Sequence, residues 1–243
     1  NYLAAIVLDK NSAGISILDH STGEFLTGQW DISEIGNVLN QFQPSELLLS
    51  ESQKFIISQK YNKQNAFISE IPDWVVEQDS AYEMLTEHFN TSNLKGFGVE
   101  DFTLSISAAG AALYYIHENF KGKTAHITRL SLFQSDQYMG LDAYSVRNLE
   151  IFNSLATQGH HGTLIKVLDK TVTAAGSRLL KQWFRMPLHN LDRINERMER
   201  ISELMENEYL REDIRKEFRQ VSDVDRILVK IATRRATPRD VYQ

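Results

Sequence analysis

The sequence predicts two parts of different fold class, an α/β domain with a mixed sheet followed by a mainly helical domain. Three observations lead to this prediction. Apolar residues run continuously or alternate in the first part, as in strands, and recur with a helical period in the second. Residues 1–120 hold 5 Lys and Arg against 16 Asp and Glu, whereas residues 121–243 hold 21 against 16. No arginine precedes Arg129. We therefore expect one domain over residues 1–120 and a second over residues 121–243, with Lys121–Thr124 as the linker.

The first domain is expected to begin with an antiparallel meander. Tyr2–Leu8 is a continuous apolar run typical of a buried central strand, and Ile15 and Ile17 alternate with polar neighbours. The predicted strands lie at 2–8, 14–18, 24–30, 46–49 and 67–71, and the predicted helices at 32–39, 52–61, 74–89 and 102–120. This order is typical of ribonuclease-H-like domains, which supports an analogy of fold and not of function.

The second domain is expected to open with a small β-pair formed by residues 126–133 and 137–141. The remainder has apolar positions with a period of 3.6 residues. Helices are predicted at 143–155, 163–168, 174–184, 191–207 and 221–233. Their outer faces carry many charged residues, as solvated helix surfaces do.

Composition excludes several classes of protein. The 243 residues are 42% hydrophobic and 24% charged, which is typical of globular domains. The absence of cysteine excludes disulfides and thiolate metal sites, and it fits a reducing, cytoplasmic location. No apolar run approaches the roughly 20 residues that span a bilayer, so no membrane role is expected. Because the chain starts at Asn1 and has no signal peptide, it is interpreted as an internal fragment.

Carboxylates offer one candidate catalytic site. A ribonuclease-H nuclease holds two metal ions between acids on its first strand, first helix and fourth strand, where this sequence offers Asp9, Glu34 and Glu51. Asp9 falls in a turn, Glu51 lies past its strand, and the negative charge of this domain opposes a nucleic-acid substrate. The metal nuclease is kept as an alternative, and no catalytic, cofactor-binding or metal-binding residue is assigned.

Other patterns are less informative. His160 and His161 have no further ligand nearby in sequence, which favours a structural role. Neither a dinucleotide-binding motif nor a G-x-x-x-x-G-K-[ST] P-loop occurs. A basic group near the end is interpreted as favourable charge at a helix C-terminus, with a phosphate contact as the alternative. This group comprises Lys230, Arg234, Arg235 and Arg239.

Four segments resemble those of one protein family. Residues 142–151 read D-A-Y-S-V-R-N-L-E-I, and residues 168–183 follow the pattern L-D-x-T-x-T-x-x-G-x-R-x-L-x-x-W. Residues 223–228 read D-V-D-R-I-L and precede Pro238-Arg239-Asp240, and residues 95–100 read K-G-F-G-V-E. Together these segments resemble the MutS family of DNA mismatch-recognition proteins, and the similarity spans the chain.

The resemblance implies a ribonuclease-H-like connector domain followed by an incomplete helical core, whose long helices act as levers. In this family the levers couple mismatched-DNA binding to a C-terminal ATPase. The mismatch-contacting domain and the ATPase, with its ATP and Mg²⁺, would lie outside the chain, so this segment is expected not to be an enzyme. Its helices would then lack partners, and an exposed apolar stripe is expected between Leu191 and Ile231. The family forms homodimers, and its connector offers a docking surface for MutL.

Particular residues receive roles on this basis. The helix over residues 74–89 is expected to turn Glu83 and Met84 outward, where they are candidates for binding a partner protein. The remaining candidates are structural. Arg147, Glu150, Arg178 and Asp223 are expected to be ion-pair or capping partners, Gly176 to lie at a close helix crossing, and Leu180 and Trp183 to be core residues.

Three hypotheses of different class follow. A coupling fragment has no catalysis of its own, a metal nuclease cleaves nucleic acid through residues 1–120, and a standalone docking module binds a partner without its helical half. A gene that continues past Gln243 into a P-loop would favour the first.

Overall fold

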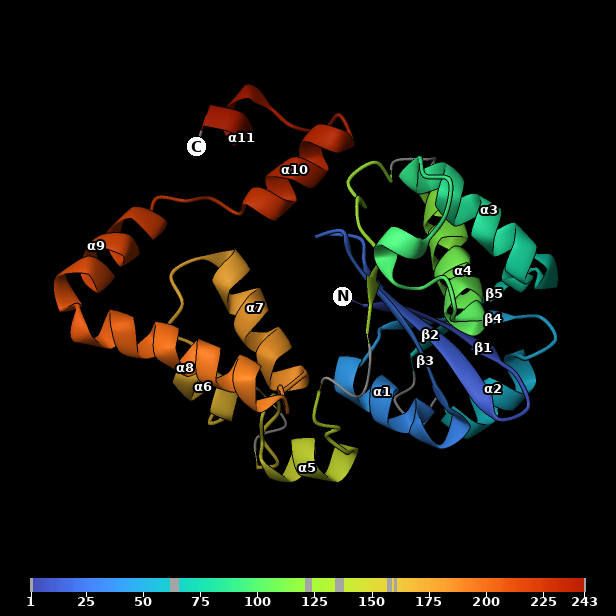
Figure 1. The fold of residues 1–243 in the computed structure, drawn as a ribbon, viewed down its shortest axis with the longest axis horizontal. Helices are drawn as coiled ribbons and strands as arrows, with labels where there is room; N and C mark the ends of the chain where they lie inside the picture. Colours follow the sequence, from blue (N-terminus) through green and yellow to red (C-terminus); the bar gives the residue numbers. More distant parts are fainter. Residues whose placement is uncertain are drawn as a thin grey trace. The chain divides into compact units, whose positions relative to one another are not determined.

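A computed structural model describes residues 2–61, 66–120, 124–133, 138–156, 159 and 161–242. The chain forms two compact units (Figure 1). The first comprises Asn1–Gln134 with Leu228–Arg235, and the second comprises Ser135–Ile227 with Ala236–Gln243. Residues 121–123, most of the predicted linker, lie outside the described residues.

A mixed sheet of six strands forms the centre of the first unit, in the order β5-β4-β1-β2-β3-β6. The first three strands make the predicted antiparallel meander, while β4 pairs parallel with β1 and β5 pairs parallel with β4. The strands are β1 Leu3–Leu8, β2 Ser12–Asp19, β3 Glu24–Asp31, β4 Glu46–Ser50, β5 Phe67–Ile71 and β6 Ser131–Leu132.

The prediction that residues 126–133 pair with residues 137–141 is wrong. Instead, β6 joins the first sheet parallel to β3, with Leu26 opposite Ser131. Tyr138 forms a single antiparallel bridge with Leu188 in the second unit. The two halves of the expected pair therefore belong to different units.

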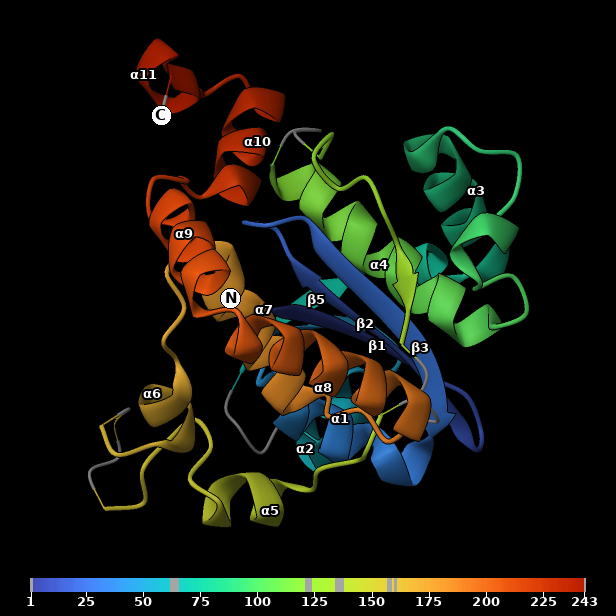
Figure 2. The same ribbon diagram turned by 60° about the vertical axis from the view of Figure 1, so that its left-hand side comes forward.

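Helices cover both faces of the sheet (Figures 1 and 2). The strands β1 and β2 are buried along nearly their whole length, which requires cover on both sides. α4 and α3 lie on one side, and α1 and α2 lie on the other. The helical elements are η1 Ile32–Glu34, α1 Ile35–Phe42, α2 Lys54–Tyr61, η2 Asp73–Val76, α3 Gln78–Phe89, η3 Lys95–Phe97 and α4 Thr103–Asn119.

Two glycines allow α4 to pack at main-chain distance from its neighbours. A Cβ atom at Gly14 of β2 would overlap the carbonyl group of Leu104. A Cβ atom at Gly110 of α4 would lie 2.5 Å from the Cβ and 2.7 Å from the Cα of Ala81 in α3. Real Cβ atoms do not approach this closely, so both crossings require glycine.

The second unit is helical. The helix expected over residues 143–155 ends at Asn148, and a helix that the sequence did not predict spans residues 208–218. Its helices are α5 Ala143–Asn148, α6 Leu164–Leu168, α7 Ala174–Arg185, α8 Leu191–Glu206, α9 Glu208–Phe218 and α11 Pro238–Tyr242. The division between the units falls inside α10, Val224–Ala232.

The expected apolar stripe is confirmed. None of the described side chains of α7, α8, α9 or α10 is buried. Leu191 is 72% exposed and Met205 is 68% exposed, although α8 is strongly amphipathic. Such faces commonly mark interaction surfaces. The exposed apolar residues include Leu191, Met198, Ile201, Leu204, Met205, Leu210, Phe218, Val221, Val224, Leu228 and Ile231.

Candidate functional site

The outer face of α3 is the first candidate site. α3 buries Ala81 and Leu85 and leaves Glu83 exposed, as the sequence predicts. Met84, expected to face outward, is only half buried and packs against the core. The face therefore combines an accessible carboxylate with a partly accessible thioether.

A hollow of about 330 Å³ lies beside Met84, between α3 and α4. Its lining includes buried Leu113, half-buried Tyr114 and exposed Glu87. An apolar lining with acidic groups nearby suits an apolar side chain carried on a basic or neutral segment of another protein.

The K-G-F-G-V-E segment supports this helix. The Glu100 carboxylate accepts a hydrogen bond from the Tyr82 hydroxyl of α3 at 3.0 Å and another from the Leu94 amide at 2.8 Å. Burial, followed by the hydrogen bond to Glu100, raises the pKa of Tyr82 and keeps its hydroxyl protonated. Gly98 has a φ of 74°, which favours glycine in this turn. The segment thus braces α3 through Tyr82.

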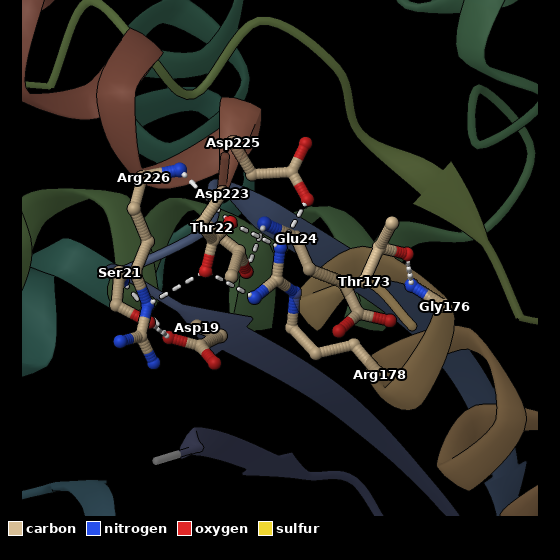
Figure 3. Close-up of polar contacts among 10 residues, drawn as sticks. All are labelled: Asp19, Ser21, Thr22, Glu24, Thr173, Gly176, Arg178, Asp223, Asp225 and Arg226. Carbon is tan, nitrogen blue, oxygen red and sulfur yellow. Dashed lines mark hydrogen bonds and ion pairs between the residues drawn. The ribbon is translucent and has the colours of Figure 1, made fainter. Parts of the chain in front are cut away.

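The second candidate site is an ion-pair junction around Arg178 of α7 (Figure 3). Its Nη1 and Nη2 atoms donate to the two carboxylate oxygens of Asp223 at 2.8 and 2.7 Å. Nη2 also donates to Asp225 at 2.6 Å, and Arg226 Nε lies 3.4 Å from Asp223. The hydrogen bond from Arg178 lowers the pKa of Asp223, and the same bond raises the pKa of Arg178. The expected ion-pair roles of Arg178 and Asp223 are confirmed, and Asp225 is an additional partner.

The loop before α7 is arranged by its own side chains. The Asp169 carboxylate accepts from the Thr171 hydroxyl and the Ser177 hydroxyl, each at 2.6 Å, which lowers the pKa of Asp169. Thr173 is the N-cap of α7, and its Oγ1 accepts from the Gly176 amide at 3.0 Å. The residues of the L-D-x-T-x-T-x-x-G-x-R pattern therefore fix the start of α7, and Arg178 lies near that start.

The expectation that Gly176 lies at a close helix crossing is wrong. A Cβ atom there would meet Thr173 Oγ1 at 2.9 Å and Thr171 Cβ at 3.4 Å, both in the loop that precedes the helix. Glycine leaves room for the capping hydroxyl. Within the described residues, a close crossing of two helices lies at Gly110.

Gly176→Val is expected to lower the free energy of unfolding by about 1 kcal/mol, because the side chain displaces the Thr173 cap. Gly176→Ala should be nearly neutral, since its gain in helix propensity offsets part of the lost cap. Urea unfolding followed by circular dichroism measures both. Gly36→Val is the control, because Gly36 lies in the first turn of α1 with open space around it. A Gly176→Val protein that is no less stable than the Gly36→Val protein would contradict this account.

The other structural candidates take different places. The Glu150 Oε1 accepts from the Leu155 amide at 2.6 Å in a turn after α5 and not at the start of a helix, and Glu150 has a left-handed φ of 46°. Arg147 is exposed and forms no ion pair within the described part of the chain. Trp183 and Leu180 are not core residues. Trp183 is 37% exposed and its ring lies 3.9 Å from the Arg197 guanidinium, so a cation–π contact covers it in place of apolar packing.

The carboxylates of the nuclease alternative do not form a site. Asp9, Glu34 and Glu51 are all exposed, and Glu34 accepts a hydrogen bond from Asn37. At the end of β1, the Gln53 amide both donates to and accepts from the Leu8 backbone, each at 2.8 Å. Among the described residues, no group of three or more His, Cys, Asp or Glu side chains is arranged to hold a metal ion. His160 lies outside the described residues, and His161 is exposed.

Comparison with known families assigns both parts of the chain to domains of one family. The family model for MutS domain II matches residues 1–128, and the model for MutS domain III matches residues 144–243. The chain belongs to the MutS family. Its ribonuclease-H-like sheet is domain II, and its helical segment is domain III; neither is the ATPase domain of MutS.

Named MutS proteins are similar over the whole chain. The DNA mismatch repair protein MutS of Cytophaga hutchinsonii is 40% identical over 244 residues, which cover 100% of this chain and 28% of that protein. The MutS proteins of Salinibacter ruber and Parabacteroides distasonis are 36% and 38% identical and cover 99% and 100% of this chain. The chain thus spans about 28% of the length of these relatives. Within the described residues, no helix is both long and apolar enough to cross a membrane.

Proposed function

We propose that the chain is a coupling segment of a DNA mismatch-recognition protein, and that the outer face of α3 is its docking surface for a MutL-type protein. The match to MutS domains II and III supports the first part. The observation that carries the second is the hollow beside Met84, with exposed Glu87 in its lining and Glu83 exposed on the same helix. In the whole protein, ATP and Mg²⁺ would bind in the ATPase domain, mismatched DNA in other domains, and the assembly would be a cytoplasmic homodimer.

The junction at Arg178 supports the coupling role. It joins the start of α7 to the start of α10 through three charge-assisted hydrogen bonds, and such bonds fix geometry as well as contributing stability. A segment that passes on a change of helix position needs fixed connections of this kind. No observation favours the nuclease, because its three carboxylates are exposed and form no metal-binding group in the described structure.

Glu83→Arg and Met84→Ala together are expected to weaken MutL binding about tenfold, the order that loss of one well-packed contact and one charge produces. Biolayer interferometry with this chain and a purified MutL protein from a related bacterium measures the dissociation constant. Glu51→Arg is the matched control, because it makes the same charge change on an exposed residue beyond β4. Equal binding by the double variant and the control would remove α3 from the docking surface, and circular dichroism would verify that both variants fold.

A further inference from the structure

Three histidines hold the segment that leaves α4. His20 lies in the turn between β2 and β3, His88 lies in the last turn of α3, and His126 lies in the segment itself. The segment, Thr124–Phe133, includes β6 and contributes Ile127 and Leu130 to the core. All three histidines belong to the first unit.

The hydrogen bonds define the protonation of two rings. His126 Nε2 lies 2.8 Å from the His20 carbonyl oxygen, and His88 Nε2 lies 2.8 Å from the Ile127 carbonyl oxygen. Because a carbonyl oxygen only accepts, each Nε2 carries the hydrogen. The neutral His126 ring therefore has a bare Nδ1, which is buried and has no hydrogen-bond partner among the described residues.

The environment of His20 opposes a positive charge. Its ring stacks on Phe120 at 3.9 Å and lies 4.8 Å from the His126 ring, and its Nδ1 is likewise buried without a partner in the described structure. Burial, followed by repulsion from His126, lowers the pKa of His20 to about 4. Asp19 acts in the opposite direction and Arg235 in the same direction.

His126 is held in the neutral form in the same way. Burial lowers its pKa first, His88 lowers it further, and the hydrogen bond to the His20 carbonyl acts against both. The turn that faces this ring has little room to adjust. Gly23 has a φ of 76°, and a Cβ atom there would lie 2.7 Å from the His126 carbonyl oxygen. Asp19 holds the turn by accepting from the Ser21 amide at 2.8 Å and hydroxyl at 2.7 Å (Figure 3).

We propose that His20, His126 and His88 clasp Thr124–Phe133 on the sheet while His20 and His126 are neutral, and that protonation of His20 and His126 releases the segment. A proton on His126 Nδ1 would place an N–H group in a buried space without an acceptor, and a second proton on His20 would bring two cations together. Opening the segment exposes both rings to water and removes this cost. The clasp borders the docking face, because His88 and Thr124 also line the hollow beside Met84. It does not depend on the proposed function, since its test uses the chain without a partner protein.

Hydrogen exchange of the 243-residue chain at about pH 7.5 and pH 5.5, corrected for intrinsic exchange rates, tests the clasp. The Ile127 amide, which donates to Thr124, and the Phe133 amide, which donates to Thr27 of β3, report on the segment. A histidine that is neutral in the closed state and has an ordinary pKa of 6.5 in the open state favours opening about tenfold more at the lower pH. We expect protection of these amides to fall by at least this factor.

A double variant, His20→Phe with His126→Gln, removes both titratable side chains. It keeps an aromatic ring against Phe120 and an amide N–H group that can donate to the carbonyl oxygen of residue 20. Its protection should change by less than about twofold between the two pH values. His189→Gln, an exposed histidine of the second unit, should behave like the parent chain. Protection that is independent of pH in the parent chain, or equally pH-dependent in the double variant, would overturn the clasp. If the variant fails to fold, NMR titration of the parent chain decides, because His20 and His126 titrating near the ordinary 6.5 would overturn it and titration well below that value would support it.

Discussion

Gly110→Ala is expected to lower the free energy of unfolding of the first unit by about 2–3 kcal/mol, despite replacing glycine with a better helix former. The added methyl group would overlap both the Cα and the Cβ of Ala81, and α3 must move to admit it. Overpacking of this kind costs about 1–3 kcal/mol and more where the neighbour is main chain, against a propensity gain of at most about 1 kcal/mol. Urea unfolding followed by tryptophan fluorescence and circular dichroism measures the change.

Two further variants distinguish the cost of overpacking from the gain in helix propensity. Gly36→Ala, in the first turn of α1 where nothing lies within 4 Å, should be neutral or slightly stabilising. Ala81→Gly in the Gly110→Ala background moves the missing methyl group to the other helix and should recover most of the loss. If Gly110→Ala instead stabilises the unit as much as Gly36→Ala does, the two helices do not meet at main-chain distance.

Arg178→Met is expected to lower the free energy of unfolding by about 2–3 kcal/mol. It removes three hydrogen bonds to carboxylates and leaves the longer, more exposed contact from Arg226 to Asp223. Hydrogen bonds between charged groups contribute about 1.5–3 kcal/mol when partly buried, and the Arg178 and Asp223 side chains are 28% and 21% exposed. Arg178→Lys should lose nearly as much, because an ammonium group cannot pair with both Asp223 oxygens in parallel.

A control variant and the pH dependence of stability test whether the ion pair of Arg178 with Asp223 causes this loss. Arg226→Met removes a longer contact from a side chain that is 63% exposed, and it should change stability by less than about 0.5 kcal/mol. The lowered pKa of Asp223 contributes stability above its ordinary value of 3.8, and this contribution is lost as the pH falls through the lower folded-state value. The difference between the parent chain and Arg178→Met should therefore shrink as the pH falls below 3.8. A difference that grows there would contradict the ion pair as its source.

Local patterns predicted most elements of the fold. The strands β1 to β5 were predictable because each is an apolar run or an alternating apolar pattern between turn residues, and the fold class and family are confirmed. The expected strand over residues 126–133 includes β6, but its pairing with β3 could not be predicted, because β3 lies about a hundred residues earlier. α9 was not predicted, because its residues are mostly charged and few apolar residues mark a helical face.

The contacts that form the candidate sites join residues far apart in the sequence, so residue spacing could not predict them. Arg178 and Asp223 stood in separate recognisable segments, but they lie 45 residues apart in sequence, so their pairing needed the structure. Gly110 has no distinctive sequence signal, because it lies among small residues that all favour burial, whereas Gly176 lies in a recognisable motif. Asp225 could be predicted as a further partner, since an acid two residues after Asp223 can reach the same cation. Glu83 was predictable as exposed from helical periodicity alone.

The small residues of α4 give the first unit a particular mechanical character. From Ser105 to Leu113 every side chain is buried, and the contacts at Gly14 and Gly110 are made by main-chain and Cβ atoms. Long side chains yield under load by changing rotamer, whereas main-chain contacts have almost no such freedom. We therefore expect a displacement of α3 to reach the sheet with little deformation of the contacts at Gly14 and Gly110. Stiffness of this kind suits a part that must transmit a displacement faithfully.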